Sequence, residues 1–179
     1  MKRFFVTIIA FWTLSQVSFA QNMDMAFVKD DKVVNASLGF VNTIYTGNGW
    51  KTTFPPISFT GEYGIVDGLI DGKASIGAGV DVSYIGTKYY DLYLKLYKYS
   101  NLIFGIRGAF HYQFIDKLDT YAGLLIGYKI VSGNSDYAIN EPVWGYYVGA
   151  RYYLTDNFAI MSEIGNNVSL ISIGVAYKF

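Results

Sequence analysis

The sequence predicts an all-β protein, an eight-stranded antiparallel up-and-down transmembrane β-barrel, and three observations lead to this fold class. The chain begins with a stretch typical of an export signal. Bulky apolar residues then alternate with small or polar residues in eight segments, as in strands that have one apolar face. The chain ends on such a segment, at Phe179. No stretch after the signal approaches about 18 consecutive apolar residues, so a membrane helix is excluded there, whereas alternating strands are not.

The N-terminal residues have the three parts of a secretory signal peptide. Lys2 and Arg3 precede an apolar run, and the small residues Ser18 and Ala20 precede the expected cleavage site. The run is shorter than the ~20 residues that a spanning helix needs, which favours a cleaved signal over a membrane anchor. The predicted organisation is a signal peptide at 1–20, a periplasmic N-terminal tail at 21–31 and a β-barrel at 32–179.

The composition excludes several classes of protein. The chain has no cysteine, so neither a lipidated cysteine nor a disulfide framework is expected. It has 14 basic and 14 acidic residues, and loss of Lys2 and Arg3 with the signal leaves a slight acidic excess, which argues against nucleic acid as a partner. With one histidine and no cysteine, we expect no metal site and no cofactor.

In the first half of the barrel, strands are predicted at residues 32–41, 57–65, 73–85 and 99–114. The loop before the second strand contains Pro55 and Pro56, which are expected to prevent regular strand pairing there. Two Asp-Gly pairs after that strand favour a tight turn, because glycine tolerates positive φ. Residues 86–100 are rich in tyrosine, and we expect them to form a long hairpin that rises beyond the membrane.

In the second half, strands are predicted at residues 120–131, 144–154, 158–165 and 168–179. Short connections alternate with long ones along the chain, apart from a short connection before the last strand. Small transmembrane barrels keep short turns on the periplasmic side and long loops outside, so this alternation also predicts the orientation. The last strand is expected to pair with the first. Its residues on one phase are expected to face lipid, namely Ile171, Ile173, Val175, Tyr177 and Phe179. The other phase is expected to lie inside the barrel, namely Leu170, Ser172, Gly174 and Ala176.

The charged residues identify the inner face. A secreted ligand binder of the lipocalin sort would turn the apolar phase inward, whereas a membrane barrel turns it toward lipid. The other phase is rich in glycine and carries charges that suit a narrow interior only when they are paired. We therefore expect a membrane barrel whose lumen is plugged by a charge network, with a narrow polar conduit as the alternative. The predicted network consists of Glu62, Asp81, Arg107, Arg151 and Glu163.

Several segments resemble a known family. They are E-Y-G at 62–64, R-G-A-F-H-Y at 107–112, D-T-Y-A-G-L-L-I-G-Y at 119–128, G-A-R-Y-Y-L-T-D-N-F at 149–158, S-E-I-G at 162–165 and the terminal Y-K-F. Together with the export signal, the whole mature chain resembles the small outer-membrane β-barrels of the OmpA, OmpX and OmpW type. The resemblance implies the outer membrane of a Gram-negative bacterium, contact with outer-membrane lipid, and recognition of Tyr177 and Phe179 by the barrel assembly machinery.

The resemblance specifies activity poorly, because related barrels serve as structural proteins, conduits and adhesins. Barrel enzymes of this size place a catalytic histidine at the outer rim, but the single histidine, His111, is expected near the opposite end of its strand, so no enzymatic activity is predicted. The tyrosine-rich hairpin is either part of an interfacial aromatic girdle or a surface-binding site. Its candidate binding residues are Tyr89, Tyr90, Tyr93, Lys95 and Tyr97.

The expected function is therefore a non-enzymatic one. We expect a monomeric outer-membrane barrel with an envelope structural or surface-interaction role and a polar-plugged lumen. The alternative is a narrow conduit for small or hydrophobic solutes across the outer membrane.

Overall fold

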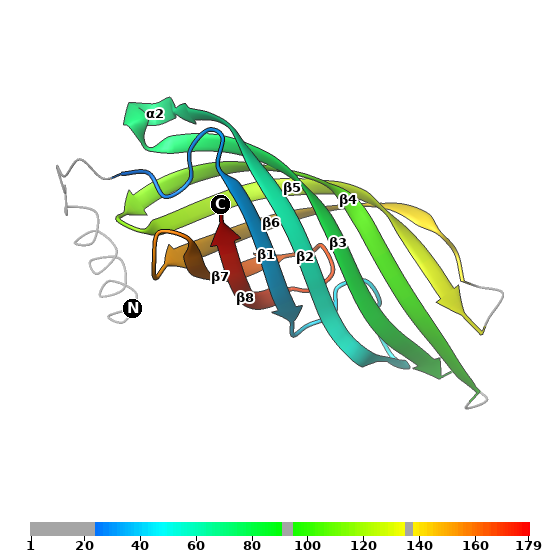
Figure 1. Cartoon of the computed structure of the whole chain (residues 1–179). Coiled ribbons are helices and arrows are strands. Elements are labelled where there is room, and N and C mark those ends of the chain that lie inside the picture. The colour runs from blue at the N-terminus through cyan, green and yellow to red at the C-terminus, as the bar shows by residue number, and fades with distance from the viewer. Residues whose placement is uncertain (1–23, 91–94, 135–137) are drawn as a thin grey trace, which may run out of the picture.

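The computed structural model describes residues 24–90, 95–134 and 138–179, and the signal peptide predicted at 1–20 lies outside them. Eight strands follow one another around a closed barrel in chain order, and each is antiparallel to its neighbours (Figure 1). The predicted all-β, up-and-down fold class is confirmed. Within these described ranges, no helix is long and apolar enough to cross a membrane.

The first and last strands close the barrel, as expected. Val34 lies opposite Tyr177 and Leu38 lies opposite Ile173 in this pairing. The elements are β1 (Lys32–Gly39), β2 (Trp50–Gly68), the one-turn helix α2 (Leu69–Gly72), β3 (Ala74–Tyr90), β4 (Leu96–Ile115), β5 (Leu118–Gly133), β6 (Glu141–Tyr153), β7 (Phe158–Gly165) and β8 (Ile171–Lys178).

The two ends of the barrel differ in their connections. One end has α2, the short turns after β4 and β6, and the C-terminus, and the other end has the connections after β1, β3, β5 and β7 (Figure 1). At the tip of the β2–β3 hairpin, Gly68 and Gly72 have φ values of 71° and 75°, as the Asp-Gly pairs predict. We call these the short-turn end and the long-loop end.

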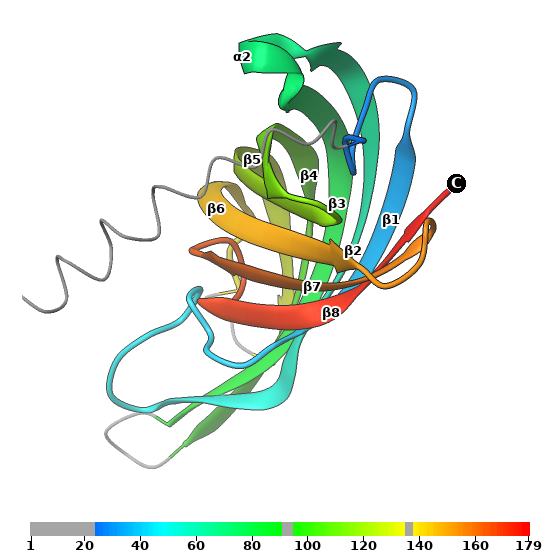
Figure 2. The same cartoon turned by 90° about the vertical axis from the view of Figure 1, so that its left-hand side faces the viewer.

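Four neighbouring strands are longer than the others and form a sheet that projects at the long-loop end. β2 to β5 have 16 to 20 residues each, whereas β1, β7 and β8 have 8 each. The pairing of β3 with β4 continues as far as Tyr90 and Leu96, so the expected long hairpin is present, although residues 91–94 lie outside the described part of the chain. Figure 2 shows this projecting sheet extending past the ends of β1 and β8.

Two expectations about strand bounds are wrong. β2 begins at Trp50 and not near residue 57, so it runs through Pro55 and Pro56. The expected interruption of regular pairing at the two prolines is confirmed, because the register against β3 passes from Phe54 to Ile57 with no partner for either proline. β1 pairs with β2 only as far as Ile57, so the preceding part of β2 is an edge strand, and its register against β3 shifts on both sides of Phe54. An edge position beside a bulge tolerates prolines, because no ladder hydrogen bond from their nitrogens is needed.

The last strand is also shorter than expected. β8 begins at Ile171 rather than at Val168. Val168 is buried inside the barrel, and Leu170, which was expected on the inner phase, is exposed. The Ser169 hydroxyl lies near the start of β8, where it accepts from the Phe40 amide and donates to the Ile171 carbonyl, beside a backbone bond of 2.9 Å from the same amide to the same carbonyl.

The apolar phase faces outward around the barrel. On β4, the Ile106 side chain is 65% exposed while the adjacent Arg107 is 8% exposed. Arg151 in β6 is 1% exposed, whereas Trp144 on the outer phase of the same strand is 71% exposed. A continuous apolar belt of this kind exceeds the few hundred Å² that soluble proteins usually expose. The inner and outer faces are therefore as predicted.

Candidate functional site

Four charged side chains form a closed ring across the lumen near the short-turn end. Arg151 contacts Glu62 through Nη2, and its Nη1 lies 3.1 Å from Asp119 Oδ2. His111 bridges the same two carboxylates, with Nδ1 2.8 Å from Asp119 Oδ1 and Nε2 3.0 Å from Glu62 Oε1. Every carboxylate oxygen in this group has a cationic or imidazole partner. We call the four residues the Arg151 ring.

The geometry of the Arg151 ring favours a charged His111. Both imidazole nitrogens face carboxylate oxygens, and a neutral imidazole can donate from only one nitrogen. The protonated ring donates from both, so two cations then balance two carboxylates. Asp119 and Arg151 are brought together directly by strand pairing, because they are register partners on β5 and β6. Loss of one member of such a buried arrangement leaves a buried charge without its partner, which is strongly destabilising.

A second charged group lies farther from the short-turn end. Arg107 Nη1 is 3.3 Å from Asp81 Oδ2, and Arg107 Nη2 is 2.5 Å from Glu163 Oε1. The guanidinium also lies over the Tyr147 ring, 3.8 Å from its centroid, which is a cation–π contact. Ser83 donates to Asp81 at 2.6 Å. We call Asp81, Arg107 and Glu163 the Arg107 group.

Tyr121 connects the two groups. Its hydroxyl donates to Glu163 Oε1 at 3.0 Å, and its ring lies 4.5 Å from the Arg151 guanidinium carbon. The ring lies flat against the opposite strand because Gly149 is its register partner, and a Cβ at that position would lie 2.4 Å from Tyr121 Cζ. Glycine on the inner phase therefore makes room for the tyrosine that joins the network.

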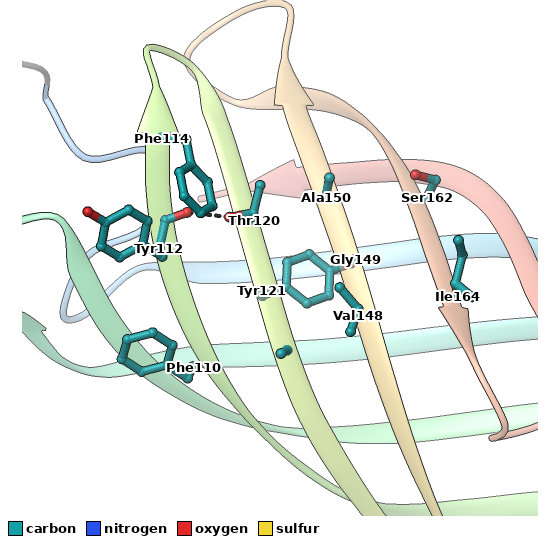
Figure 3. A pocket seen from close by; sticks show the side chains of 11 residues that line it. Phe110, Tyr112, Phe114, Thr120, Tyr121, Val148, Gly149, Ala150, Ser162 and Ile164 are labelled. Carbon is teal, nitrogen blue, oxygen red and sulfur yellow. Dashed lines mark hydrogen bonds between the residues drawn. The ribbon is translucent and has the colours of Figure 1, made fainter. Parts of the chain in front are cut away.

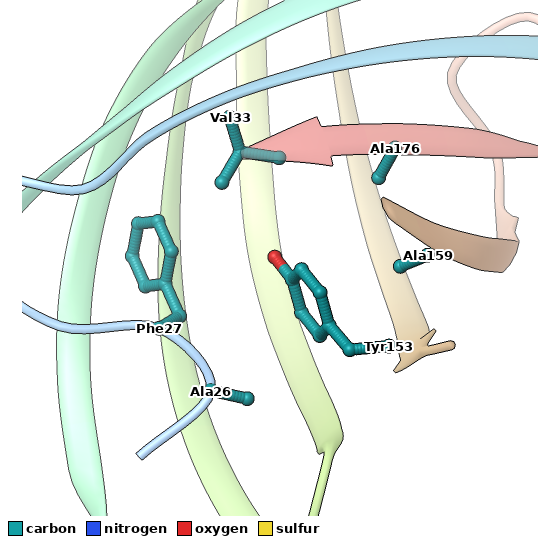
Figure 4. Close-up of a cluster of buried hydrophobic side chains, with 6 residues drawn as sticks. All are labelled: Ala26, Phe27, Val33, Tyr153, Ala159 and Ala176. Carbon is teal, nitrogen blue, oxygen red and sulfur yellow. The ribbon is translucent and has the colours of Figure 1, made fainter. Parts of the chain in front are cut away.

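The N-terminal segment closes the lumen at the short-turn end. The sequence predicts only a tail for residues 21–31, but the described part of it, residues 24–31, folds against the barrel interior. Phe27 is 2% exposed, and its ring stacks on His111 with 4.2 Å between the centroids. Figure 4 shows Phe27 inside the barrel beside Tyr153 and Val33, and the same apolar cluster includes Ala26, Ala159 and Ala176.

Hydrogen bonds to the barrel wall hold this segment in place. Lys178 Nζ donates to the Ala26 carbonyl at 3.0 Å, and the Ser75 hydroxyl donates to the Phe27 carbonyl at 2.9 Å. The chain passes close to Gly64, where an added Cβ would lie 1.9 Å from the Val28 carbonyl oxygen. Only glycine fits at this crossing. We call residues 24–31 the N-terminal plug.

An apolar layer fills the lumen toward the long-loop end. Ile85, Ile103 and Val168 form a buried cluster, and Ile44 from the β1–β2 loop packs against it. Above this layer, the Lys129 ammonium lies 2.6 Å from Glu141 Oε1 and 4.7 Å from the centre of the Tyr45 ring. Residues of the β1–β2 loop therefore cover the mouth of the barrel.

A small cavity lies between these layers. The cavity beside Asp81, Tyr147 and Glu163 has a volume of about 20 Å³, which is room for about one water molecule. Each described strand is paired with both neighbours along part of its length, and the unpaired edges, in β2 before Ile57 and in β6 before Tyr147, belong to the end that projects at the long loops. The described contacts inside the barrel are ion pairs, hydrogen bonds and apolar packing.

All five residues of the predicted network lie in the lumen, but they form two groups instead of one. Sequence reasoning missed Asp119 and Phe27. Asp119 directly precedes the strand predicted at 120–131, but it belongs to β5 and lies on its inner phase, two residues before Tyr121. Phe27 belongs to a segment without a period, so no pattern indicates that it enters the barrel. His111, which the sequence analysis considers only as a catalytic candidate, belongs to the Arg151 ring.

The predicted binding residues of the hairpin do not share one surface. Tyr89 and Tyr97 are register partners on the inner side of the projecting sheet, and Tyr89 lies against Trp50 with 5.0 Å between the centroids. Tyr90 is on the outer side, and the Lys95 ammonium lies 5.1 Å from the centre of the Tyr97 ring. Tyr93 lies outside the described residues.

The outer wall carries the predicted assembly signal and a shallow groove. Tyr177 and Phe179 are both exposed, and their rings meet edge to face with 5.1 Å between the centroids. The groove has a volume of about 520 Å³ and lies between Phe114 and Ile164, over the small side chains of Ala150 and Ser162 (Figure 3). It opens on the apolar outer face of the barrel.

Within the parts of the chain that the structure describes, no group of three or more His, Asp or Glu side chains is arranged to hold a metal ion.

Comparisons with known proteins identify the fold. No protein-family model and no curated protein sequence matches the chain. Among solved structures, the chain is similar to the outer membrane protein OprG from Pseudomonas aeruginosa, with a TM-score of 0.56 and 12% identity over 87% of this chain and 99% of that chain. It is also similar to Neisserial surface protein A, with a TM-score of 0.52 and 14% identity over 83% of this chain and 96% of that chain. The chain therefore has the fold of small outer-membrane β-barrels.

Proposed function

We propose that the chain is a non-enzymatic, non-conducting barrel of a Gram-negative outer membrane that anchors the projecting sheet at the cell surface. Its role is structural or one of surface interaction. The apolar belt and the fold shared with outer-membrane barrels support membrane embedding. The barrel assembly machinery recognises Tyr177 and Phe179 as the terminal signal and inserts the chain into the membrane, where it is a monomer. The short turns then face the periplasm and the long loops face outward.

The observation that carries the proposal is the closure of the lumen at several levels. The N-terminal plug, the Arg151 ring, the Arg107 group and the layer around Ile85 and Ile103 follow one another along the barrel. A permeating ion would have to displace paired charges and apolar side chains in turn. Each displacement leaves buried charges without partners, which is strongly unfavourable in a low-dielectric interior.

Conductance in planar bilayers tests this proposal. We expect no single-channel steps from the folded mature chain. The matched variants are Arg107→Ala, which removes the cation that contacts Asp81 and Glu163 in the lumen, and Ile106→Ala, which changes the adjacent residue on the outer face. Reproducible steps from the unmodified chain that change in Arg107→Ala but not in Ile106→Ala would overturn the closed lumen. That result would favour the alternative function, a narrow conduit through the barrel.

A further inference from the structure

Three lysines lie side by side on the outer face of the projecting sheet. Lys51 of β2 is the register partner of Lys88 of β3, and Lys88 is the register partner of Lys98 of β4. They share the outward phase with Tyr84, because Tyr84 and Lys88 are four residues apart on one strand. We call Lys51, Lys88 and Lys98 the lysine row.

The lysine row has no acidic partner within the described residues. No carboxylate lies within 4.0 Å of any of the three ammonium groups, and the contact of Lys88 is with the Tyr90 ring, at 5.6 Å. Like charges directly opposite one another on neighbouring strands are destabilising. The paired charges of the lumen show that this chain places carboxylates beside buried cations. A row of cations that have no carboxylate partner among the described residues therefore points to an anion outside this part of the chain.

The lysine row lies just beyond the apolar belt, where its side chains can reach the headgroup layer of a membrane. On β3 the outward residues from Ile76 to Tyr84 are apolar or aromatic, and Lys88 follows after Gly86. At about 3.3 Å per residue and a strand tilt of about 40°, Lys88 lies about 10 Å beyond Tyr84 along the barrel axis. The polar layer beyond the hydrocarbon is about 5–7 Å thick on each side. The flexible lysine side chain can extend back from the Lys88 backbone to this polar layer.

We propose that the lysine row binds the phosphate groups of anionic lipid headgroups in the leaflet at the long-loop end. This inference rests on the proposed embedding in a membrane. Lipid is the occupant because the three lysines continue the lipid-facing side of the barrel wall, and they do not lie at the tip of the hairpin or inside its mouth. Neighbouring strands are about 5 Å apart, so the row presents three ammonium groups to one or two headgroups.

Lipid selectivity at the barrel surface tests the proposal. The mature chain is refolded in phosphatidylcholine bilayers, and spin-labelled phosphatidylglycerol and phosphatidylcholine are compared by electron spin resonance. The ratio of their association constants measures the preference for an anionic headgroup. We expect K51Q/K88Q/K98Q to lower this ratio at least about twofold through loss of the charge attraction. K51R/K88R/K98R should keep it, because arginine preserves the charge.

A matched control separates the row from net charge. K29Q/K73Q/K117Q removes the same charge from three lysines that are not register partners, at the short-turn end, and should leave the ratio close to that of the unmodified chain. An unchanged ratio in K51Q/K88Q/K98Q, or an equal loss in the control, would overturn the proposal. If the unmodified chain shows no motionally restricted lipid at all, the proposed embedding fails instead. If it restricts both lipids equally, only the lysine row fails.

Discussion

At the scale of single residues, the lumen is organised by side chains that each have two partners. Arg151 and His111 both bridge Glu62 and Asp119, and Tyr121 joins this ring to Glu163. The inner charges could be predicted from their phase on the strands. Their partners could not, because Glu62 and Arg151 are 89 residues apart and their contact depends on how the barrel closes. Asp119 was missed for a related reason, since a carboxylate beside a short turn has the same local pattern whether or not it enters the lumen.

Removing the arginine of the Arg151 ring should strongly destabilise the barrel. In Arg151→Met, Glu62 and Asp119 lose the cation that both of them contact, although the long apolar side chain still fills much of the space. Loss of one partner from a buried charged group costs about 3–5 kcal/mol. The free energy of unfolding in lipid vesicles, measured by urea titration, checks this. Lys117→Met, at an exposed turn, is the control and should have little effect; equal stabilities of the two variants would argue against a structural role for the ring.

At the scale of elements, the period-two alternation predicted all eight strands. Each strand has an inner face that packs against other side chains in the lumen and an outer face that carries bulky apolar residues. Two elements escaped this argument. The edge position of the first part of β2 allows Pro55 and Pro56 within a strand, and edge positions are set by the lengths of the neighbouring strands. The N-terminal plug has no period, since its residues are held by contacts with the interior of the barrel and not by strand pairing.

The N-terminal plug should leave the barrel when Gly64 is enlarged. Gly64→Ala places a methyl group where the Val28 carbonyl oxygen lies, so the segment cannot keep its path along β2. We expect cleavage by trypsin after Lys29 to become at least about tenfold faster in the folded barrel. The control is Gly61→Ala on the same strand, where the added Cβ would have an ordinary contact of 3.7 Å with Val80. Equal protection of Lys29 in both variants would contradict the close crossing.

At the scale of the whole molecule, the polar and apolar side chains are distributed in the opposite way to those of a soluble barrel. Paired charges and glycine fill its interior, and bulky apolar side chains cover its exterior. This polarity follows from the size of an eight-stranded barrel, whose interior is only wide enough for side chains. A closed interior leaves the outer wall and the projecting sheet as the surfaces that meet other molecules. The lysine row, which we propose to bind lipid headgroups, lies on these surfaces where the projecting sheet leaves the apolar belt.

A charge on the outer face of β8 tests this polarity. Ile173 is 55% exposed on the outer wall and is the register partner of Leu38 across the closing seam. In lipid, Ile173→Lys should lower the free energy of unfolding by about 2–4 kcal/mol near the midplane, because the ammonium must leave water. Ile173→Ala removes the same apolar side chain without adding charge and should cost less. The difference between the two variants, measured by denaturant titration in bilayers, isolates the cost of the charge. If Lys and Ala at this position cost the same, the residue faces water, and the assignment of inner and outer faces is reversed.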